Sequence, residues 1–244
     1  MQGLFHFRHV TKEKMGSTRL CWEKALALDP ESAPLNAALG FIHGIDARFG
    51  WWDDRETALG KARAYADKAL EIDPGNADAH IASGCVFLMR GRYDEAVADA
   101  RRAVELAPGS ADVADIAGFI LAPSGCPREA VAQGEKAMAL SPNYPALYLG
   151  NLGNAYRLSG RTDDAIAAFK AYHARSPGFG LTDLVIIYQE LGQVEEARRT
   201  VEQLMAARPD FTIAGWLKTQ FIRRDTARVE ADTVALRAAG LPTG

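Results

Sequence analysis

Apolar residues recur at three- and four-residue steps along most of the chain, with polar residues between them. In residues 75–108 the small residues Gly84, Ala96 and Ala103 stand among these apolar positions, and Gly91 separates two such stretches. This spacing places the apolar side chains on one face of a helix. Glycine tolerates the positive φ that often ends a helix. Residues 75–108 are therefore predicted to form two amphipathic helices joined by a turn at Gly91.

Prolines mark the same unit along the chain. Pro74 stands 34 residues before Pro108, and Pro142 stands 34 residues after it. Two helices in each unit of about this length are the sequence sign of a helical solenoid. We therefore expect an all-α fold and a single solenoid over residues 1–244. The expected repeats are about 3–30, 34–74, 75–108, 109–142, 143–177 and 178–209, followed by a capping helix pair over 210–240.

The fifth unit carries a resemblance to a known repeat. It resembles the tetratricopeptide pattern of large, small and aromatic residues at Leu149, Leu152, Gly153, Tyr156, Ala165, Phe169 and Pro177. Tyr172 departs from that pattern, which has a small residue there. The resemblance implies an α-solenoid of helical hairpins that forms a right-handed superhelix, with the first helix of each pair on a concave face. It also implies a function in binding proteins or peptides.

Two units depart from the regular length. The first has a clear second helix, over about residues 17–28, but only a short first helix, over about 3–10. The second unit has an insertion around residues 46–55 that contains Trp51 and Trp52. These two indoles either form a binding feature or are buried where the helices extend by a few turns. We prefer burial, because large aromatic side chains usually belong to the core.

A narrower resemblance lies in four stretches, residues 3–15, 46–52, 141–161 and 235–242. They resemble the tetratricopeptide region that follows the catalytic domain of bacterial class III adenylate cyclases. This resemblance implies that the chain is the non-catalytic regulatory or interaction arm of a larger bacterial signalling protein, and that this protein continues upstream of Met1.

Composition excludes several classes of function. The formal net charge is −3, whereas a nucleic-acid surface normally shows a basic stripe. No apolar run reaches the roughly 20 residues that span a membrane, and the N-terminus lacks the apolar core of a secretory signal. The three cysteines are odd in number and widely spaced, which indicates free thiols in a reducing compartment. The sequence therefore predicts a cytoplasmic protein.

The sequence shows no pattern of catalytic or metal-binding residues. It lacks HExxH, a Walker-type phosphate loop and a dinucleotide-binding glycine motif. The paired acids at residues 53–54 and 163–164 stand where helices are expected to begin, which N-capping explains. His80 occupies a core-like position. We therefore expect no enzyme activity, no metal and no cofactor.

The expected function lies on the concave face, where a protein or peptide segment, or a second copy of the chain in a homodimer, would bind. The residues predicted to face this groove are Phe41, Ile81, Cys85, Leu88, Asp115, Phe119, Asn154, Arg157, Ile186 and Gln189. Gly150 stands where chaperone-binding relatives have a clamp lysine, so an acidic C-terminal peptide is not the expected partner. The alternative is a small-ligand sensor, or an unrecognised enzyme, that uses the same groove.

Overall fold

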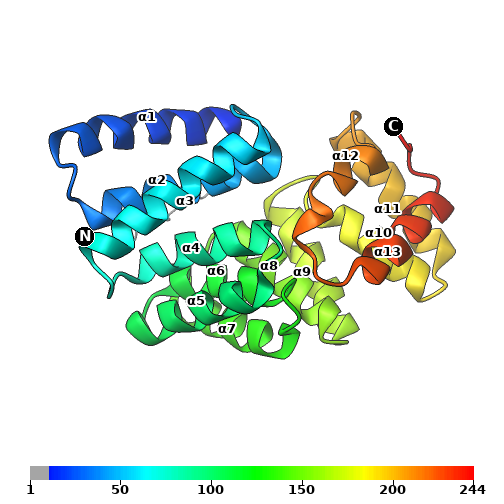
Figure 1. The fold of residues 1–244 in the computed structure, drawn as a ribbon. Helices are drawn as coiled ribbons and strands as arrows, with labels where there is room; N and C mark the ends of the chain where they lie inside the picture. Colours follow the sequence, from blue (N-terminus) through cyan, green and yellow to red (C-terminus); the bar gives the residue numbers. More distant parts are fainter. Residues whose placement is uncertain (1–10) are drawn as a thin grey trace.

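The secondary structure of the described residues is helical throughout. The computed structural model describes residues 11–244, and within that range it contains α-helices, one short 3-10 helix (η1) and no strand (Figure 1). The elements are α1 Lys12–Leu28, α2 Ala33–Phe49, α3 Arg55–Ile72, α4 Ala77–Met89, α5 Tyr93–Leu106, α6 Ala111–Leu121, α7 Pro127–Leu140, α8 Ala146–Leu158, α9 Thr162–Arg175, α10 Leu181–Glu190, α11 Val194–Ala207, α12 Ile213–Leu217, η1 Gln220–Ile222 and α13 Thr226–Ala238. The all-α prediction is confirmed.

Local signals explain where the helices begin and where the chain turns. The side chains of Asp54, Asn76 and Ser110 accept hydrogen bonds from the backbone N–H of the third residue of α3, α4 and α6. Such caps satisfy donors that the helix itself leaves without partners. Gly91 has a φ of +71° between α4 and α5, a conformation that glycine adopts without strain. The two helices of this pair are therefore joined by the turn that the sequence predicts.

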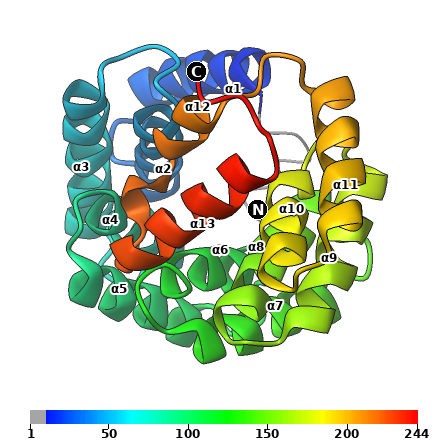
Figure 2. The ribbon, with the colours of Figure 1, turned by 90° about the vertical axis from the view of Figure 1, so that its right-hand side faces the viewer.

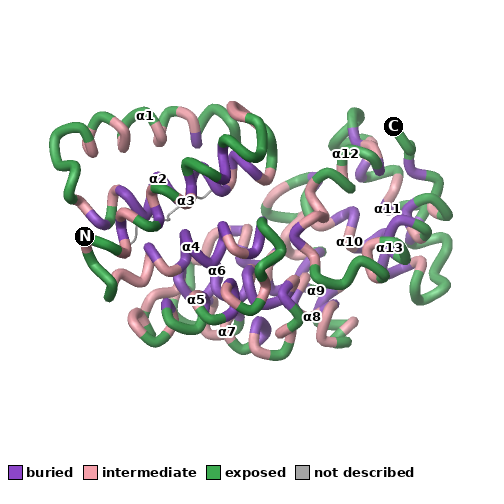
Figure 3. The backbone as a smooth tube through the Cα atoms, in the orientation of Figure 1, coloured by how far each residue is buried: buried purple, intermediate pink, exposed green. Residues whose placement is uncertain are grey.

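Antiparallel helix pairs stack side by side, and most contacts lie within a pair or between adjacent pairs. The pairs are α2 with α3, α4 with α5, α6 with α7, α8 with α9, and α10 with α11. One large apolar cluster runs from α2 to α8, and a second extends from α9 to the C-terminal residues. In Figure 3 the buried positions follow the faces between the stacked helices. This arrangement is expected for a solenoid, because a single hairpin cannot bury its own apolar faces.

The N-terminal unit differs from its prediction. The short helix expected over about residues 3–10 lies outside the described residues. The helix expected from residue 17 begins at Lys12 instead and becomes α1. Met15 is the buried residue of α1, and most of this helix is exposed (Figure 3).

The C-terminal residues do not continue the stack. After α11 the chain forms α12 and then crosses the concave side, so that α13 lies inside the ring of stacked helices (Figure 2). η1 contacts α4, and α13 packs against α10. We call residues 218–238 the inner segment. Within the described residues, no helix is both long and apolar enough to cross a membrane.

Glycines at the helix contacts provide the first test. A Cβ added at Gly153 would lie 2.8 Å from Cε1 of the buried Phe169, whereas a Cβ at Gly60 would meet nothing within 4 Å. Overpacking costs about 1–3 kcal/mol, and replacing an exposed helical glycine by alanine gains about 0.5–1 kcal/mol. We therefore expect Gly153→Ala to lower the midpoint of urea unfolding and Gly60→Ala to raise it. Equal midpoints for the two variants would contradict the close contact between α8 and α9.

Candidate functional site

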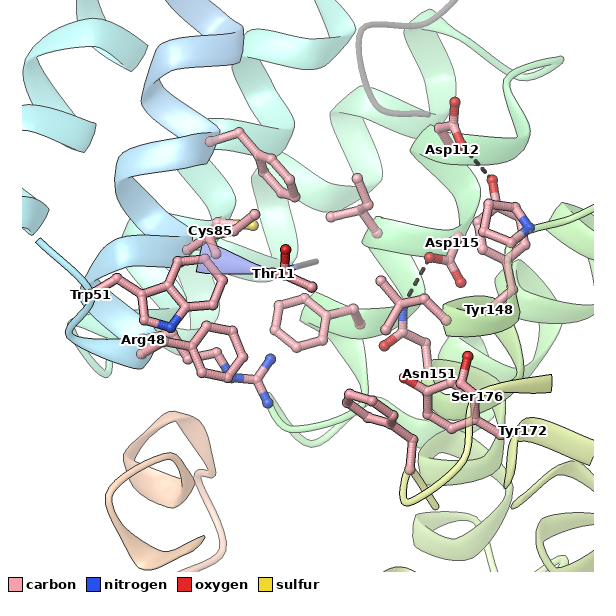
Figure 4. Close-up of a pocket in the computed structure, with 18 of the residues that line it drawn as sticks. Thr11, Arg48, Trp51, Cys85, Asp112, Asp115, Tyr148, Asn151, Tyr172 and Ser176 are labelled. Carbon is pink, nitrogen blue, oxygen red and sulfur yellow. Dashed lines mark hydrogen bonds between the residues drawn. The ribbon is translucent and has the colours of Figure 1, made fainter. Parts of the chain in front are cut away.

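A cavity of about 480 Å³ lies on the concave side. The first helices of four successive pairs, α2, α4, α6 and α8, contribute to its wall, as do α9 and residues near it (Figure 4). Its position follows from the repeat, since the first helix of each pair faces inward. The cavity is therefore built from residues that are far apart in the sequence.

One wall of the cavity is aromatic. The rings of Phe49 and Trp51 stack with their centroids 5.0 Å apart. The guanidinium of Arg48 lies over the ring of Phe49 at 5.5 Å and over that of Phe119 at 5.0 Å. Phe41 also lines this part of the cavity. This wall offers a large apolar surface with one cation fixed against it.

The opposite wall is acidic and is formed by the N-terminal part of α6 together with α8. The hydroxyl of Tyr148 donates to Oδ1 of Asp112 at 2.6 Å, and Nδ2 of Asn151 donates to Oδ2 of Asp115 at 2.8 Å. Asp115 is only 2% exposed. Its Oδ1 has no hydrogen-bond donor within residues 11–244. The spacing of three residues places both carboxyl groups on one face of α6, toward α8.

Burial changes the protonation of this wall. It raises the pKa of Asp115 to about 8, although the hydrogen bond from Asn151 works against the shift and the neighbouring Asp112 adds to it. Burial, together with the charge of Asp112, also raises the pKa of Asp78 to about 6. The reason is that a low-dielectric surrounding disfavours the ionised form of an acid. Asp115 is therefore largely protonated near neutral pH.

The aromatic wall keeps its positive charge. Burial and, to a lesser extent, the charge of Arg223 lower the pKa of Arg48 to about 10, but the guanidinium remains protonated at neutral pH. Burial raises the pKa of the Cys85 thiol to about 12, with Arg48 opposing the shift. Because the thiolate is the nucleophilic form, this cysteine is poorly suited to covalent chemistry.

The structure brings four of the predicted groove residues together at the cavity: Phe41, Cys85, Asp115 and Phe119. For Ile81, Leu88 and Ile186 the predicted place on an open face is wrong, because all three are 0% exposed. Ile81 and Leu88 belong to the first apolar cluster and Ile186 to the second. Their side chains pack between adjacent pairs, where apolar surface is removed from water.

The remaining predicted residues, Asn154, Arg157 and Gln189, lie in the C-terminal half of the concave face. The inner segment covers this half (Figure 2). Oδ1 of Asn154 accepts a hydrogen bond from Arg223 of that segment at 3.5 Å. Arg157 is buried, and Gln189 is half-buried on α10. The predicted open groove is thus closed here by the chain itself.

A buried ion-pair network holds the inner segment in place. Asp232 of α13 is 0% exposed, and both its carboxylate oxygens accept hydrogen bonds from Arg157. Arg223 donates to Oδ2 of the same carboxylate at 2.9 Å. Glu190 accepts a further bond from Arg157 at 2.9 Å. Arg228 lies a further 3.8 Å from Oδ1 of Asp232. A buried carboxylate paired in this way satisfies the requirement that a buried charge has partners.

Sequence reasoning missed Arg48, Asp112, Tyr148, Asn151 and Tyr172, which also line the cavity. One signal was present for the acids, since Asp112 and Asp115 interrupt the otherwise apolar sequence of α6. No local signal marks the others, because they reach the cavity only through the stacking of α2, α8 and α9.

The insertion forms a structural loop after α2. Oδ1 of the buried Asp46 accepts hydrogen bonds from the backbone N–H of Trp51 and Trp52, and its Oδ2 accepts one from Asp53. α2 and α3 have 17 and 18 residues, compared with 13 in α4, so the helices do extend. The indole of Trp52 packs under Arg19 at 4.6 Å, whereas Trp51 lines the cavity.

One group of possible metal ligands lies beside this loop. The atoms of His43, Asp46 and Asp53 that could ligate a metal ion lie within 4.8 Å of one another. Asp46, however, already binds three backbone N–H groups, and Asp53 pairs with Lys61 at 2.7 Å. Burial and the cations Lys61 and Arg19 lower the pKa of His43 to about 4. The carboxylate of Asp46 is occupied by backbone hydrogen bonds, and the ammonium group of Lys61 lies where a metal ion would be repelled. The three side chains therefore stabilise the loop rather than form a metal site.

Comparison with known proteins identifies the repeat. Models of the tetratricopeptide repeat match residues 59–111 and 156–220. The chain contains tetratricopeptide repeats. Comparison with curated proteins gave no significant match.

Solved structures share the fold. YrrB, described as a TPR protein with an unusual peptide-binding site, matches with a TM-score of 0.52 and 22% identity, over 78% of this chain and 93% of that chain. PilW, a type IV pilus biogenesis factor, matches with a TM-score of 0.62 and 21% identity, over 83% and 92%. The Cut9–Hcn1 hetero-tetramer of the APC/C matches with a TM-score of 0.66 and 17% identity, over 86% of this chain and 40% of that one. At these identities the likeness concerns the fold.

The raised pKa of Asp115 makes stability depend on pH. Between an unfolded pKa of about 4 and the folded pKa of about 8, the unfolded chain loses this proton while the folded chain keeps it, so stability falls as pH rises. The lowered pKa of His43 acts in the opposite direction below about pH 6.5. From about pH 6.5 to 8 we therefore expect wild type to lose up to about 1.4 kcal/mol per pH unit relative to Asp115→Asn. Parallel pH profiles of urea unfolding for the two proteins would contradict the burial of a carboxyl group that ionises only at raised pH.

The Asp232 network provides another prediction. Asp232→Asn keeps the shape of the side chain but leaves Arg157 and Arg223 without their buried counter-charge. Breaking a buried pair in this way costs about 3–5 kcal/mol. Hydrogen exchange should show loss of protection in α13 first, because the inner segment depends on these bonds. Glu230→Gln, an exposed carboxylate on the same helix, is the matched control and should leave exchange unchanged.

Proposed function

We propose that this chain is a protein-interaction scaffold that binds a segment of a partner protein in the cavity between α2 and α9. The observation that supports this proposal is the cavity itself, with its aromatic wall facing its acidic wall across the concave side (Figure 4). Apolar grooves of this kind commonly mark partner sites. Proteins built from tetratricopeptide repeats generally mediate protein–protein interactions.

The division of the concave face favours this half as the site. The C-terminal half is filled by the inner segment, which the ion pairs of Asp232 hold. The N-terminal half presents Phe41 and Phe119 to the cavity. One fold relative, YrrB, has an unusual peptide-binding site, which is in keeping with a peptide ligand in such a fold.

The proposal also covers the larger protein to which the chain belongs and its location. The four stretches that resemble the region after the catalytic domain of class III adenylate cyclases support a role as the regulatory arm of a bacterial signalling protein. The free thiols Cys21, Cys85 and Cys126 support a cytoplasmic location. Pairing of two copies through the concave face is a further form that the interaction can take.

A small-ligand sensor is the second candidate function. The cavity of about 480 Å³ falls within the roughly 300–1,000 Å³ of small-molecule sites. A short peptide and a metabolite would both contact the same aromatic wall. They differ in extent, because a peptide would continue along the concave face beyond the cavity.

The test compares two phenylalanines of similar burial. Phe119 lines the cavity, whereas Phe87 packs against the same apolar cluster under Arg63 and Arg92, outside the cavity. Peptides would be selected with the full chain from a random library displayed on phage. We expect Phe119→Ala to weaken their binding about tenfold or more, because it removes a central apolar contact. Phe87→Ala should leave affinity unchanged.

Calorimetry gives the affinities, and the melting temperatures are recorded beside them. Equal affinities for the two variants would contradict binding at the cavity. Saturable binding of metabolites but of no peptide, with the same dependence on Phe119, would favour the sensor.

A further inference from the structure

A buried arginine stands at the cavity without a carboxylate partner. Arg48 lines the cavity, and its Nε is buried with no hydrogen-bond acceptor among the described residues. Burial and the charge of Arg223 lower its pKa, Cys85 and Tyr172 oppose the shift, and no carboxylate is among the groups that act on it. A buried charge usually has a counter-charge or hydrogen-bond partners. Arg48 is therefore one half of an ion pair whose other half residues 11–244 do not supply.

Two aromatic rings fix the position of this guanidinium. It lies over the ring of Phe119 at 5.0 Å and over that of Phe49 at 5.5 Å. Such contacts use the faces of the rings. They leave the N–H groups at the edge of the guanidinium plane for hydrogen bonds. In Figure 4 the guanidinium of Arg48 points into the cavity, toward the side on which Tyr172 lies. The cation is therefore in place before a ligand binds.

Tyr172 adds a neutral hydrogen-bond donor to the cavity lining. This residue departs from the repeat pattern, and Gly150 makes room for it, because a Cβ added at Gly150 would lie 2.5 Å from Cε1 of Tyr172. Burial and the charges of Asp183 and Asp115 raise the pKa of Tyr172 to about 12. Arg48 opposes this shift, so its guanidinium lies near the tyrosine. The hydroxyl group keeps its proton at neutral pH and can donate it to an acceptor beside Arg48.

The charges around the cavity favour an anion on this side. Arg208 is a second cation of the lining, and it forms no ion pair within residues 11–244. The acids of the lining belong to the opposite wall, where Asp112 accepts a hydrogen bond from Tyr148 and Asp115 is buried largely in its neutral form. Near neutral pH two guanidinium groups therefore face the charge of Asp112. Neither acid is among the groups that shift the pKa of Arg48.

We propose that the cavity recognises an acidic side chain of the partner, whose carboxylate binds the edge of the Arg48 guanidinium and the hydroxyl of Tyr172. Arg208 adds to the attraction, and a neighbouring apolar residue of the partner lies on the aromatic wall. This inference rests on the proposed function and specifies the chemistry of the partner. A guanidinium binds a carboxylate through two parallel N–H bonds. A single negative charge suits a cavity whose other wall carries Asp112.

The experiment uses the library selection on the full chain and reads the composition of the selected peptides. We expect Asp or Glu beside a large apolar residue. Arg48→Met keeps an apolar stem but removes the charge, and it should weaken the best peptide about tenfold or more. Tyr172→Phe should have a smaller effect, because it removes a neutral donor. Arg63→Met is the matched control, since Arg63 also lies over a ring, that of Phe87 at 4.8 Å, but outside the cavity.

A double-mutant cycle separates recognition from a structural role. The peptide whose acidic residue is replaced by its amide should lose about tenfold in affinity for the wild-type protein and for Arg63→Met. It should lose little for Arg48→Met, because the partner of the carboxylate is already absent. A merely structural role of Arg48 would weaken the acidic peptide and the amide peptide equally.

Urea unfolding of the free protein provides a second readout. Arg48 is a buried charge without a counter-charge, so Arg48→Met should leave the midpoint unchanged or raise it. A lowered midpoint, together with an equal loss of affinity for both peptides, would assign Arg48 to the fold and overturn the site.

Three further outcomes would overturn the inference. Selected peptides that depend on Phe119 but lack an acidic residue, or carry a basic one, would overturn it and leave the proposed function standing. Absence of any binding that depends on Phe119 would remove both. Concentration-dependent dimers in sedimentation that Arg48→Met abolishes, with no peptide able to compete, would show that a second copy fills the cavity instead.

Discussion

Each helical pair of this chain has apolar faces that it cannot bury alone, and the arrangement of the whole molecule follows from that constraint. Adjacent pairs meet along these faces, and small residues such as Gly84 and Gly153 let the backbones approach. A stack solves the problem for every pair except those at the ends. The two ends solve it differently, since α1 lies largely exposed over the first pair while the C-terminal residues turn back into the concave side.

That return divides the concave face into two halves. The inner segment occupies the C-terminal half of the concave face. η1 contacts α4, and α13 packs against α10. The backbone N–H of Arg224 donates to the carbonyl of Pro123, in the turn before α7. A partner that needed this half would have to displace the Asp232 network. A partner confined to the cavity between α2 and α9 would not. Within the described residues, the cavity between α2 and α9 therefore needs no displacement of the inner segment.

Two buried carboxyl groups, one in each half, show that a buried acid needs either cationic partners or a proton. Asp232 and Asp115 are almost equally inaccessible. Three arginines surround Asp232, two of them from its own segment, so the charge has its partners. Asp115 has an amide on one side and the cavity on the other, so burial is compensated by protonation. Asp232 thus keeps its charge within the folded chain, whereas Asp115 is buried largely in its neutral form.

The sequence by itself determined the helices, their pairing and the repeat, because these depend on local spacing of apolar and small residues and on caps and turns such as Asn76 and Gly91. It also determined that Phe41, Cys85, Asp115 and Phe119 face inward, through the position of the first helices. Only the tertiary structure decided that Ile81 and Leu88 lie between pairs, and that Arg157 meets Asp232, 75 residues away. The direction of the C-terminal return and the meeting of α2 with α8 and α9 around one cavity depend on how each pair rotates against the next. Small rotations between pairs add up over several repeats, so the relative position of distant helices cannot be predicted from a local sequence pattern.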